Sequence, residues 1–156
     1  MLNLLNNSRS LFALLFILFF SFQTKAQGDF GIGLHLGSPV GITAKVYTSN
    51  SISVEGLLAW DARRESYFVN VSGLLEMQLD RTDFNIYFGP GVFVGKERLR
   101  NTFESGDVFV LGPTGTLGIN IFFGQLEVYG QLNPRIAIIE RSFIALGGGL
   151  GGRFYF

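Results

Sequence analysis

The C-terminal stretch FIALGGGLGGRFYF, from Phe143 to Phe156, alternates between two kinds of residue. Every second residue counted back from Phe156 is apolar or glycine, whereas the residues between them include the single charge, Arg153. Because successive side chains of a β-strand point to opposite faces, the stretch predicts a strand with one face suited to lipid. The other face would line a crowded interior in which Arg153 needs a partner.

The whole chain is rich in apolar residues and poor in charge. It has 156 residues, of which 47% are hydrophobic and 15% charged, with 21 glycines and no cysteine. This length suits one domain, and soluble domains are usually about a quarter charged. The absence of cysteine excludes a disulfide framework, a thiolate metal site and a lipid anchor on an N-terminal cysteine. Twelve basic and twelve acidic residues balance, so we expect no nucleic-acid partner.

Residues Met1 to Ala26 have the features of a secretory signal peptide. Arg9 precedes an uninterrupted apolar run, Leu11–Phe20, that is too short to cross a bilayer as a helix. Small residues at positions 24 and 26 favour cleavage before Gln27, and a retained anchor is the alternative. We therefore expect a signal peptide over residues 1–26 and one further domain over residues 27–156.

The remaining chain alternates in segments of about ten residues, separated by turn signals, as in membrane barrels. An even strand number puts both termini on one side, which is periplasmic in bacterial barrels, with the longer loops opposite. The longest loop is expected at Gly95–Asp107. The pattern predicts an all-β fold, an eight-stranded antiparallel up-and-down transmembrane β-barrel, with strands at Asp29–Leu36, Gly41–Thr48, Ile52–Trp60, Tyr67–Leu79, Asp83–Val94, Val108–Phe122, Gln125–Ile138 and Phe143–Phe156.

Alternation also sorts the residues of these strands into two faces. One face has no charged residue and carries aromatic residues near the strand ends, as in the aromatic girdles of membrane barrels. The opposite face collects polar residues, namely His35, Lys45, Glu55, Asn70, Ser72, Glu76, Thr114, Thr116, Asn120, Gln125, Glu127, Gln131, Asn133, Arg135 and Arg153. Equal numbers of cations and carboxylates there predict a closed, salt-bridged interior formed by Lys45, Glu55, Glu76, Glu127, Arg135 and Arg153. The alternative is the wet face of a soluble sheet.

Few residues of the sequence suggest catalysis or metal binding. His35 is the only histidine, and with Ser38 and Glu55 it could form a hydrolytic group of the kind found in outer-membrane lipid-modifying barrels. Those enzymes hold histidine and serine two residues apart on one strand, a pair that this sequence lacks. Scattered carboxylates and one histidine show no metal-ligand spacing, and the glycine clusters precede no helix. We expect no catalytic residue, no metal and no cofactor.

The segment Gly95–Arg100 is the best binding candidate. Its basic residues, Lys96, Arg98 and Arg100, would lie at the outer rim and could meet the phosphates of lipopolysaccharide. The alternative is a solvated loop, since nearby acidic residues offset the charge.

Three segments and the signal peptide resemble small outer-membrane β-barrel proteins of Gram-negative bacteria, the outer membrane protein beta-barrel domain family. They are GIGLHLGSPVGITAKVY (Gly31–Tyr47), NIYFGPGVFVG (Asn85–Gly95) and the terminal GGRFYF. The resemblance implies an outer-membrane location and a final strand, ending in Tyr155 and Phe156, that the barrel-assembly machinery reads during insertion. It implies outer-membrane lipid and lipopolysaccharide as surroundings, and we expect a monomer.

Three functions follow from these observations. The first is a structural or surface-interaction barrel without catalysis. The second is a lipid-modifying enzyme centred on His35. The third is a secreted soluble barrel that binds an apolar ligand, which would require the two faces to be inverted.

Overall fold

The computed structural model describes residues 29–49, 51–61, 66–100, 105–139 and 142–156. The predicted signal peptide and its cleavage site lie outside these residues. Among the described residues, no helix is long and apolar enough to cross a membrane.

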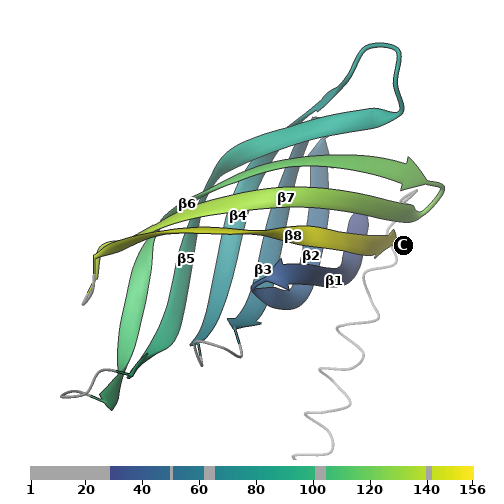
Figure 1. The fold of residues 1–156 in the computed structure, drawn as a ribbon. Coiled ribbons are helices and arrows are strands. Elements are labelled where there is room, and N and C mark those ends of the chain that lie inside the picture. Colours follow the sequence, from purple (N-terminus) through teal and green to yellow (C-terminus); the bar gives the residue numbers. More distant parts are fainter. Residues whose placement is uncertain (1–28, 50, 62–65, 101–104, 140–141) are drawn as a thin grey trace, which may run out of the picture.

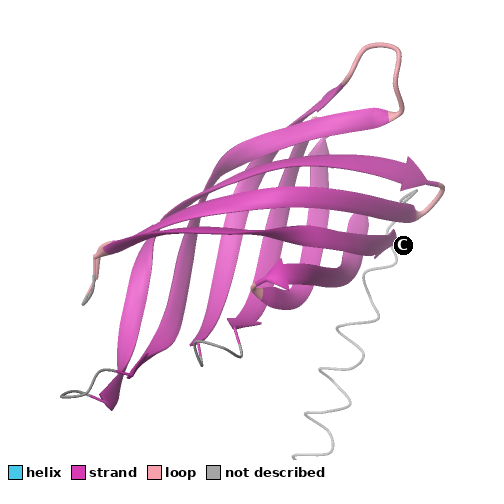
Figure 2. Ribbon diagram, viewed as in Figure 1, coloured by secondary structure: helices cyan, strands magenta, loops and turns pink. Residues whose placement is uncertain are grey.

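The chain forms one closed barrel in which each strand pairs with the next in sequence (Figures 1 and 2). Strand β1 closes the barrel by pairing antiparallel with β8, from Gly31 opposite Tyr155 to Ser38 opposite Gly148. The predicted eight-stranded antiparallel up-and-down barrel is confirmed. Its strands are β1 (Phe30–Ser38), β2 (Val40–Ser49), β3 (Ile52–Asp61), β4 (Ser66–Gln78), β5 (Phe84–Arg100), β6 (Ser105–Phe123), β7 (Leu126–Ala137) and β8 (Phe143–Tyr155).

Side chains alternate between exterior and interior along the strands. In β4, for example, Tyr67 and Val69 are exposed, whereas Phe68 and Asn70 are buried. The predicted apolar face is the exterior of the barrel. Gln125, predicted to lie inside, is instead exposed, because it directly follows the turn at Gly124, where a φ of +63° favours glycine.

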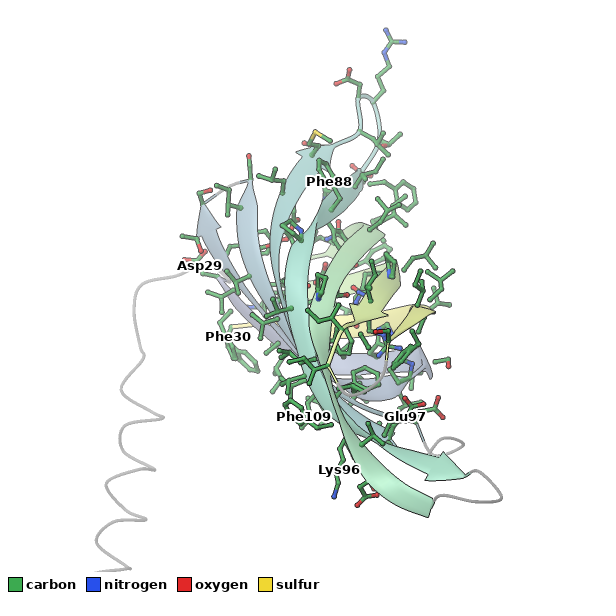
Figure 3. All side chains as sticks on the ribbon, turned by 90° about the vertical axis from the view of Figure 1, so that its left-hand side faces the viewer. Asp29, Phe30, Phe88, Lys96, Glu97 and Phe109 are labelled. Carbon is green, nitrogen blue, oxygen red and sulfur yellow. The ribbon has the colours of Figure 1, made fainter. Side chains whose placement is uncertain are left out.

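Exposed aromatic residues lie near both ends of the barrel. At the loop side, Trp60 pairs with Tyr67, Tyr67 with Lys96, and Lys96 with Phe109, so these residues form one row across β3 to β6. Figure 3 labels two members of this row, Lys96 and Phe109. Phe30, Phe84, Phe154 and Phe156 are exposed towards the end that holds the C-terminus. Two such belts are typical of barrels whose ends meet the membrane surfaces.

The hairpin of β5 and β6 is longer than predicted. Its register is continuous from Phe84 opposite Ile121 to Arg100 opposite Ser105. The predicted loop Gly95–Asp107 is therefore wrong, and the link between the two strands covers residues 101–104, which lie outside the described ranges. The charged residues of this segment suggested a loop. The hydrogen-bonded pairing of two strands can, however, continue into water, where exposed charges are well solvated.

Large inward tyrosines lie opposite glycines on neighbouring strands. A Cβ atom added to Gly118 would come within 2.3 Å of the Tyr87 ring, and one added to Gly151 within 2.3 Å of the Tyr129 hydroxyl. These glycines thus leave the space that a narrow barrel needs for aromatic rings. The pairs are Gly31 with Tyr155, Gly118 with Tyr87 and Gly151 with Tyr129.

We predict that Gly118→Ala lowers the free energy of unfolding by about 1–3 kcal/mol, because the added methyl group collides with the Tyr87 ring. The matched control is Gly73→Ala on the exterior, where an added Cβ meets nothing within 4 Å. Urea unfolding in detergent micelles measures both, and equal effects of the two substitutions would contradict the packing argument.

Candidate functional site

A cluster of charged side chains lies inside the barrel. It contains two cations and three carboxylates, each from a different strand, and each makes at least one ion pair within the cluster. We call this set the charge cluster; its members are Lys45 of β2, Glu55 of β3, Glu76 of β4, Glu127 of β7 and Arg153 of β8. Buried charges persist only when paired and hydrogen-bonded, so the contacts of each member matter.

Glu127 is the centre of the charge cluster and accepts hydrogen bonds from four side chains. Its Oε2 accepts from Arg153 Nη1 at 3.0 Å and from the Tyr155 hydroxyl at 2.8 Å. Its Oε1 accepts from Asn120 Nδ2 at 2.5 Å and from Lys45 Nζ at 3.4 Å. This carboxylate is fully buried, and the four donors replace the water that it has lost.

Arg153 connects strands that lie on different sides of the barrel interior. Besides Glu127 on the adjacent strand, its guanidinium donates to Glu55 on β3, and its Nε donates to Thr43 Oγ1 at 3.1 Å. The guanidinium carbon also lies 3.8 Å from the centroid of the Tyr129 ring. A planar donor with several N–H groups suits such a site, because it can bind two carboxylates at once.

Lys45 extends the charge cluster towards the end that holds the termini. Its Nζ lies 2.5 Å from Glu76 Oε1 and 4.6 Å from the centroid of the Tyr87 ring. Glu76 also accepts from the Tyr47 hydroxyl at 2.6 Å and from Ser53 Oγ at 2.8 Å. Ion pairs therefore link β2 to β4 and β7, and β3 to β8, across the interior.

Uncharged polar side chains form a second layer next to the charge cluster. Gln131 Nε2 donates to Glu55 at 2.9 Å, and its Oε1 accepts from the Tyr87 hydroxyl at 2.8 Å. Asn133 Nδ2 donates to Thr116 Oγ1 at 3.0 Å, and Thr116 in turn contacts Ser72 Oγ at 3.1 Å. The layer continues the hydrogen-bonded filling of the interior.

Arg135 shares the inward face with the charge cluster but lies nearer the loop side. Its guanidinium carbon is 4.0 Å from the centroid of the Phe68 ring and 5.9 Å from that of Phe93. The structure thus brings five of the six predicted network residues together and places Arg135 among aromatic residues. Alternation along a strand gives the face of a residue but not its height in the barrel.

His35 is buried beside Tyr129, and neither of its ring nitrogens hydrogen-bonds to Ser38 or Glu55. Its Nδ1 lies 3.2 Å from the Tyr129 hydroxyl, and the two rings stack at 18°. Ser38 is exposed at the end of β1, and Glu55 accepts hydrogen bonds from Arg153 and Gln131. In the part of the chain that the structure describes, no group of three or more His, Cys, Asp or Glu side chains could hold a metal ion.

The predicted surface and assembly residues lie at opposite ends of the barrel. Lys96 is exposed and forms an ion pair of 2.6 Å with Asp107; the side chains of Arg98 and Arg100 fall outside the described part. Tyr155 points inward to Glu127, as given above. Phe156 is exposed, its N–H donates to the carbonyl of Phe30 at 3.0 Å, and its ring packs edge-on against Phe154.

Sequence reasoning placed Tyr155 on the inward face of the last strand but missed Tyr47 and Tyr87. The hydroxyls of all three tyrosines donate to a Glu or Gln side chain inside the barrel. Tyr47 and Tyr87 lie at inward positions of their strands, so the alternation that identified the glutamates would also have placed these two tyrosines inside. Aromatic residues were expected on the exterior, where most membrane barrels display them.

Comparisons with known proteins establish the fold. No family model matches the sequence, and no curated protein matches it. The structure is similar to the N-terminal β-barrel domain of Pseudomonas aeruginosa OprF, with a TM-score of 0.66 at 10% identity, covering 81% of this chain and 95% of that one. It is also similar to Neisserial surface protein A, with a TM-score of 0.53 at 11% identity, covering 83% and 94%. The chain therefore has the fold predicted from its sequence, that of small outer-membrane β-barrels.

We predict that Glu127→Leu lowers the free energy of unfolding by about 3–5 kcal/mol, because it leaves the Arg153 charge buried with one partner fewer. The control is Lys96→Gln, which breaks an exposed ion pair and should cost about 1 kcal/mol or less. Urea unfolding in lipid vesicles measures both. A Glu127→Leu barrel as stable as the unmodified protein would show that the charge cluster is not needed for stability.

Proposed function

We propose that the protein is an outer-membrane barrel with a structural or surface-interaction role, exported by a signal peptide over residues 1–26, with a closed interior and no catalytic activity. The observation that carries this proposal is that polar and apolar side chains lie on the opposite sides from those they take in soluble proteins. Charged groups are paired inside, whereas large apolar side chains cover the outside.

The exterior supports a membrane location. Exposed apolar side chains occur on every strand, and soluble proteins seldom expose apolar patches larger than a few hundred Å² without a partner. Aromatic residues at both ends of this surface would lie at the membrane interfaces. One of the two similar structures is described as a surface protein, which agrees with the proposed location.

The interior supports a structural role more than a transport role. Arg153 reaches Glu55 and Lys45 reaches Glu127, so side chains meet across the lumen. An eight-stranded barrel is just wide enough for side chains to fill it. The polar filling also disfavours a soluble barrel for an apolar ligand, and the position of His35 disfavours a hydrolase.

The loop-side row of Trp60, Tyr67, Lys96 and Phe109 marks where we expect the outer membrane surface. On β5, positions 98 and 100 follow Lys96 away from the barrel. We therefore propose that this end meets lipopolysaccharide, with Lys96, Arg98 and Arg100 as the candidate phosphate contacts. The ion pair between Lys96 and Asp107 weakens the positive charge available there.

We predict that the purified protein, inserted into planar lipid bilayers, gives no stable single-channel conductance, because the charge cluster blocks the lumen. Circular dichroism and gel mobility of the same protein preparation confirm that folded barrel is present. Regular conductance steps from folded protein would contradict the closed interior.

We predict that deletion of Phe156 reduces the amount of folded barrel in the outer membrane several-fold, because the assembly machinery would no longer read the terminal aromatic residue. His35→Ala is the control and should assemble at nearly normal levels. Outer-membrane fractions separated by gel electrophoresis without boiling give the measurement. Equal amounts of folded barrel from the two variants would argue against Phe156 as an assembly signal.

A further inference from the structure

The apolar exterior of the barrel has different heights on opposite sides. On β2 the outward residues are apolar from Val40 to Val46, and the next outward residue, Thr48, is exposed and polar. Strand β6 lies opposite β2, because three strands separate the two in either direction around the closed barrel. On β6 the outward residues are apolar or glycine from Phe109 to Phe123, which is a much longer run.

The two runs fit very different thicknesses of membrane. With a rise of about 3.3 Å per residue and a strand tilt of roughly 35–45°, the run on β2 spans about 15 Å along the barrel axis and the run on β6 about 35 Å. Outer-membrane barrels typically carry an apolar band about 25 Å tall. One side of this barrel is therefore shorter than the usual band, and the opposite side is taller.

The difference in height arises at the loop side. At the terminal side, the residues that begin the apolar runs neighbour one another on adjacent strands: Val46 pairs with Phe30, the Phe156 N–H donates to the Phe30 carbonyl, Phe154 pairs with Leu126, and Leu126 pairs with Phe123. The runs thus start close together at this end, and their unequal lengths appear at the other end.

The height changes in a step between β8 and β1. Within the described residues, pairing of these strands ends at Ser38 opposite Gly148. Strand β8 continues beyond this point beside β7 and carries Leu146 and Ile144 on its outer face. These two side chains are 70% and 81% exposed, because no described strand lies beside them on the β1 side.

The backbone of β8 at this step favours water or lipid head groups. The Phe156 N–H donates to β1, and backbone groups repeat their direction every second residue, so those of Leu146 and Ile144 also face the β1 side. No described strand pairs with them there. Unpaired N–H and C=O groups are costly in hydrocarbon, so the hydrocarbon region should end before it reaches Leu146 on this side.

Tilting of the barrel does not remove the difference in height. A tilt raises one side of the apolar band and lowers the opposite side, but it leaves the height of each side unchanged. The bilayer itself must therefore differ in thickness around the barrel. A bilayer thins beside an apolar surface that is too short for it.

We propose that the barrel thins the membrane beside β1 and β2 at the loop side, and that this sector binds lipids whose acyl chains are shorter than those of the surrounding bilayer. Short chains fill a thin sector without compression, whereas long chains suit the taller side at β6. This inference rests on the proposed membrane location.

Fluorescence quenching by brominated lipids tests the lipid preference. Trp60 is the single tryptophan, so in a Trp60→Phe background Ile42→Trp on β2 and Leu117→Trp on β6 each give one probe. Both positions are outward, with 43% and 52% exposure. The vesicles contain dioleoyl phosphatidylcholine and increasing fractions of brominated dimyristoleoyl phosphatidylcholine, and quenching by brominated dioleoyl phosphatidylcholine calibrates each probe.

We expect the short-chain lipid to be enriched about twofold beside the probe at Ile42 and not beside the probe at Leu117. Equal enrichment at the two positions would overturn the thinned sector and leave the membrane location standing. Absence of quenching at both positions by either brominated lipid would overturn the membrane location, and the inference with it.

Spin labels provide a second measurement that does not use tryptophan. The chain has no cysteine, so Leu36→Cys and Leu117→Cys give single labels, each six residues along its strand from Phe30 or Phe123 at the terminal side. We expect collisions with a water-soluble nickel chelate to be several-fold more frequent at Leu36, and equal shielding of the two labels would overturn the proposal. Labels at Phe30→Cys and Phe123→Cys should lie at equal depth; a difference there matching that at Leu36 and Leu117 would show a tilted barrel instead.

Discussion

The buried ion pair between Arg153 and Glu127 is the interaction on which the rest of the barrel depends. Neither charge can remain inside without partners, and the partners come from β2, β3, β6 and β8 as well as β7. The barrel must therefore be narrow enough for side chains on opposite walls to meet. Glycines opposite Tyr87, Tyr129 and Tyr155 make this narrowness compatible with large rings in the same space.

The same alternation that pairs charges inside produces the apolar exterior. A shift of one residue in a strand would exchange its two faces, placing its polar or charged side chains in lipid and its large apolar side chains in the lumen. The charged interior and the apolar exterior therefore favour the same register of strand pairing.

The faces of the strands could be predicted from the sequence because they depend on a period of two. The ion-pair partners could not: Glu55 and Arg153 are 98 residues apart in sequence, and their contact depends on the diameter and stagger of the closed barrel. For the same reason alternation grouped Arg135 with the charge cluster, although it lies against Phe68. The length of the β5–β6 hairpin was missed because apolar patterning ends at the membrane, whereas strand pairing does not.

The central claim is that the protein is a membrane barrel whose polar side chains face inward. Its most direct test is cell fractionation followed by gel electrophoresis before and after boiling. The account predicts a band in the outer-membrane fraction whose mobility changes on boiling, because a closed barrel with a hydrogen-bonded interior resists detergent until heated. A soluble periplasmic or secreted band with the same mobility before and after boiling would contradict it.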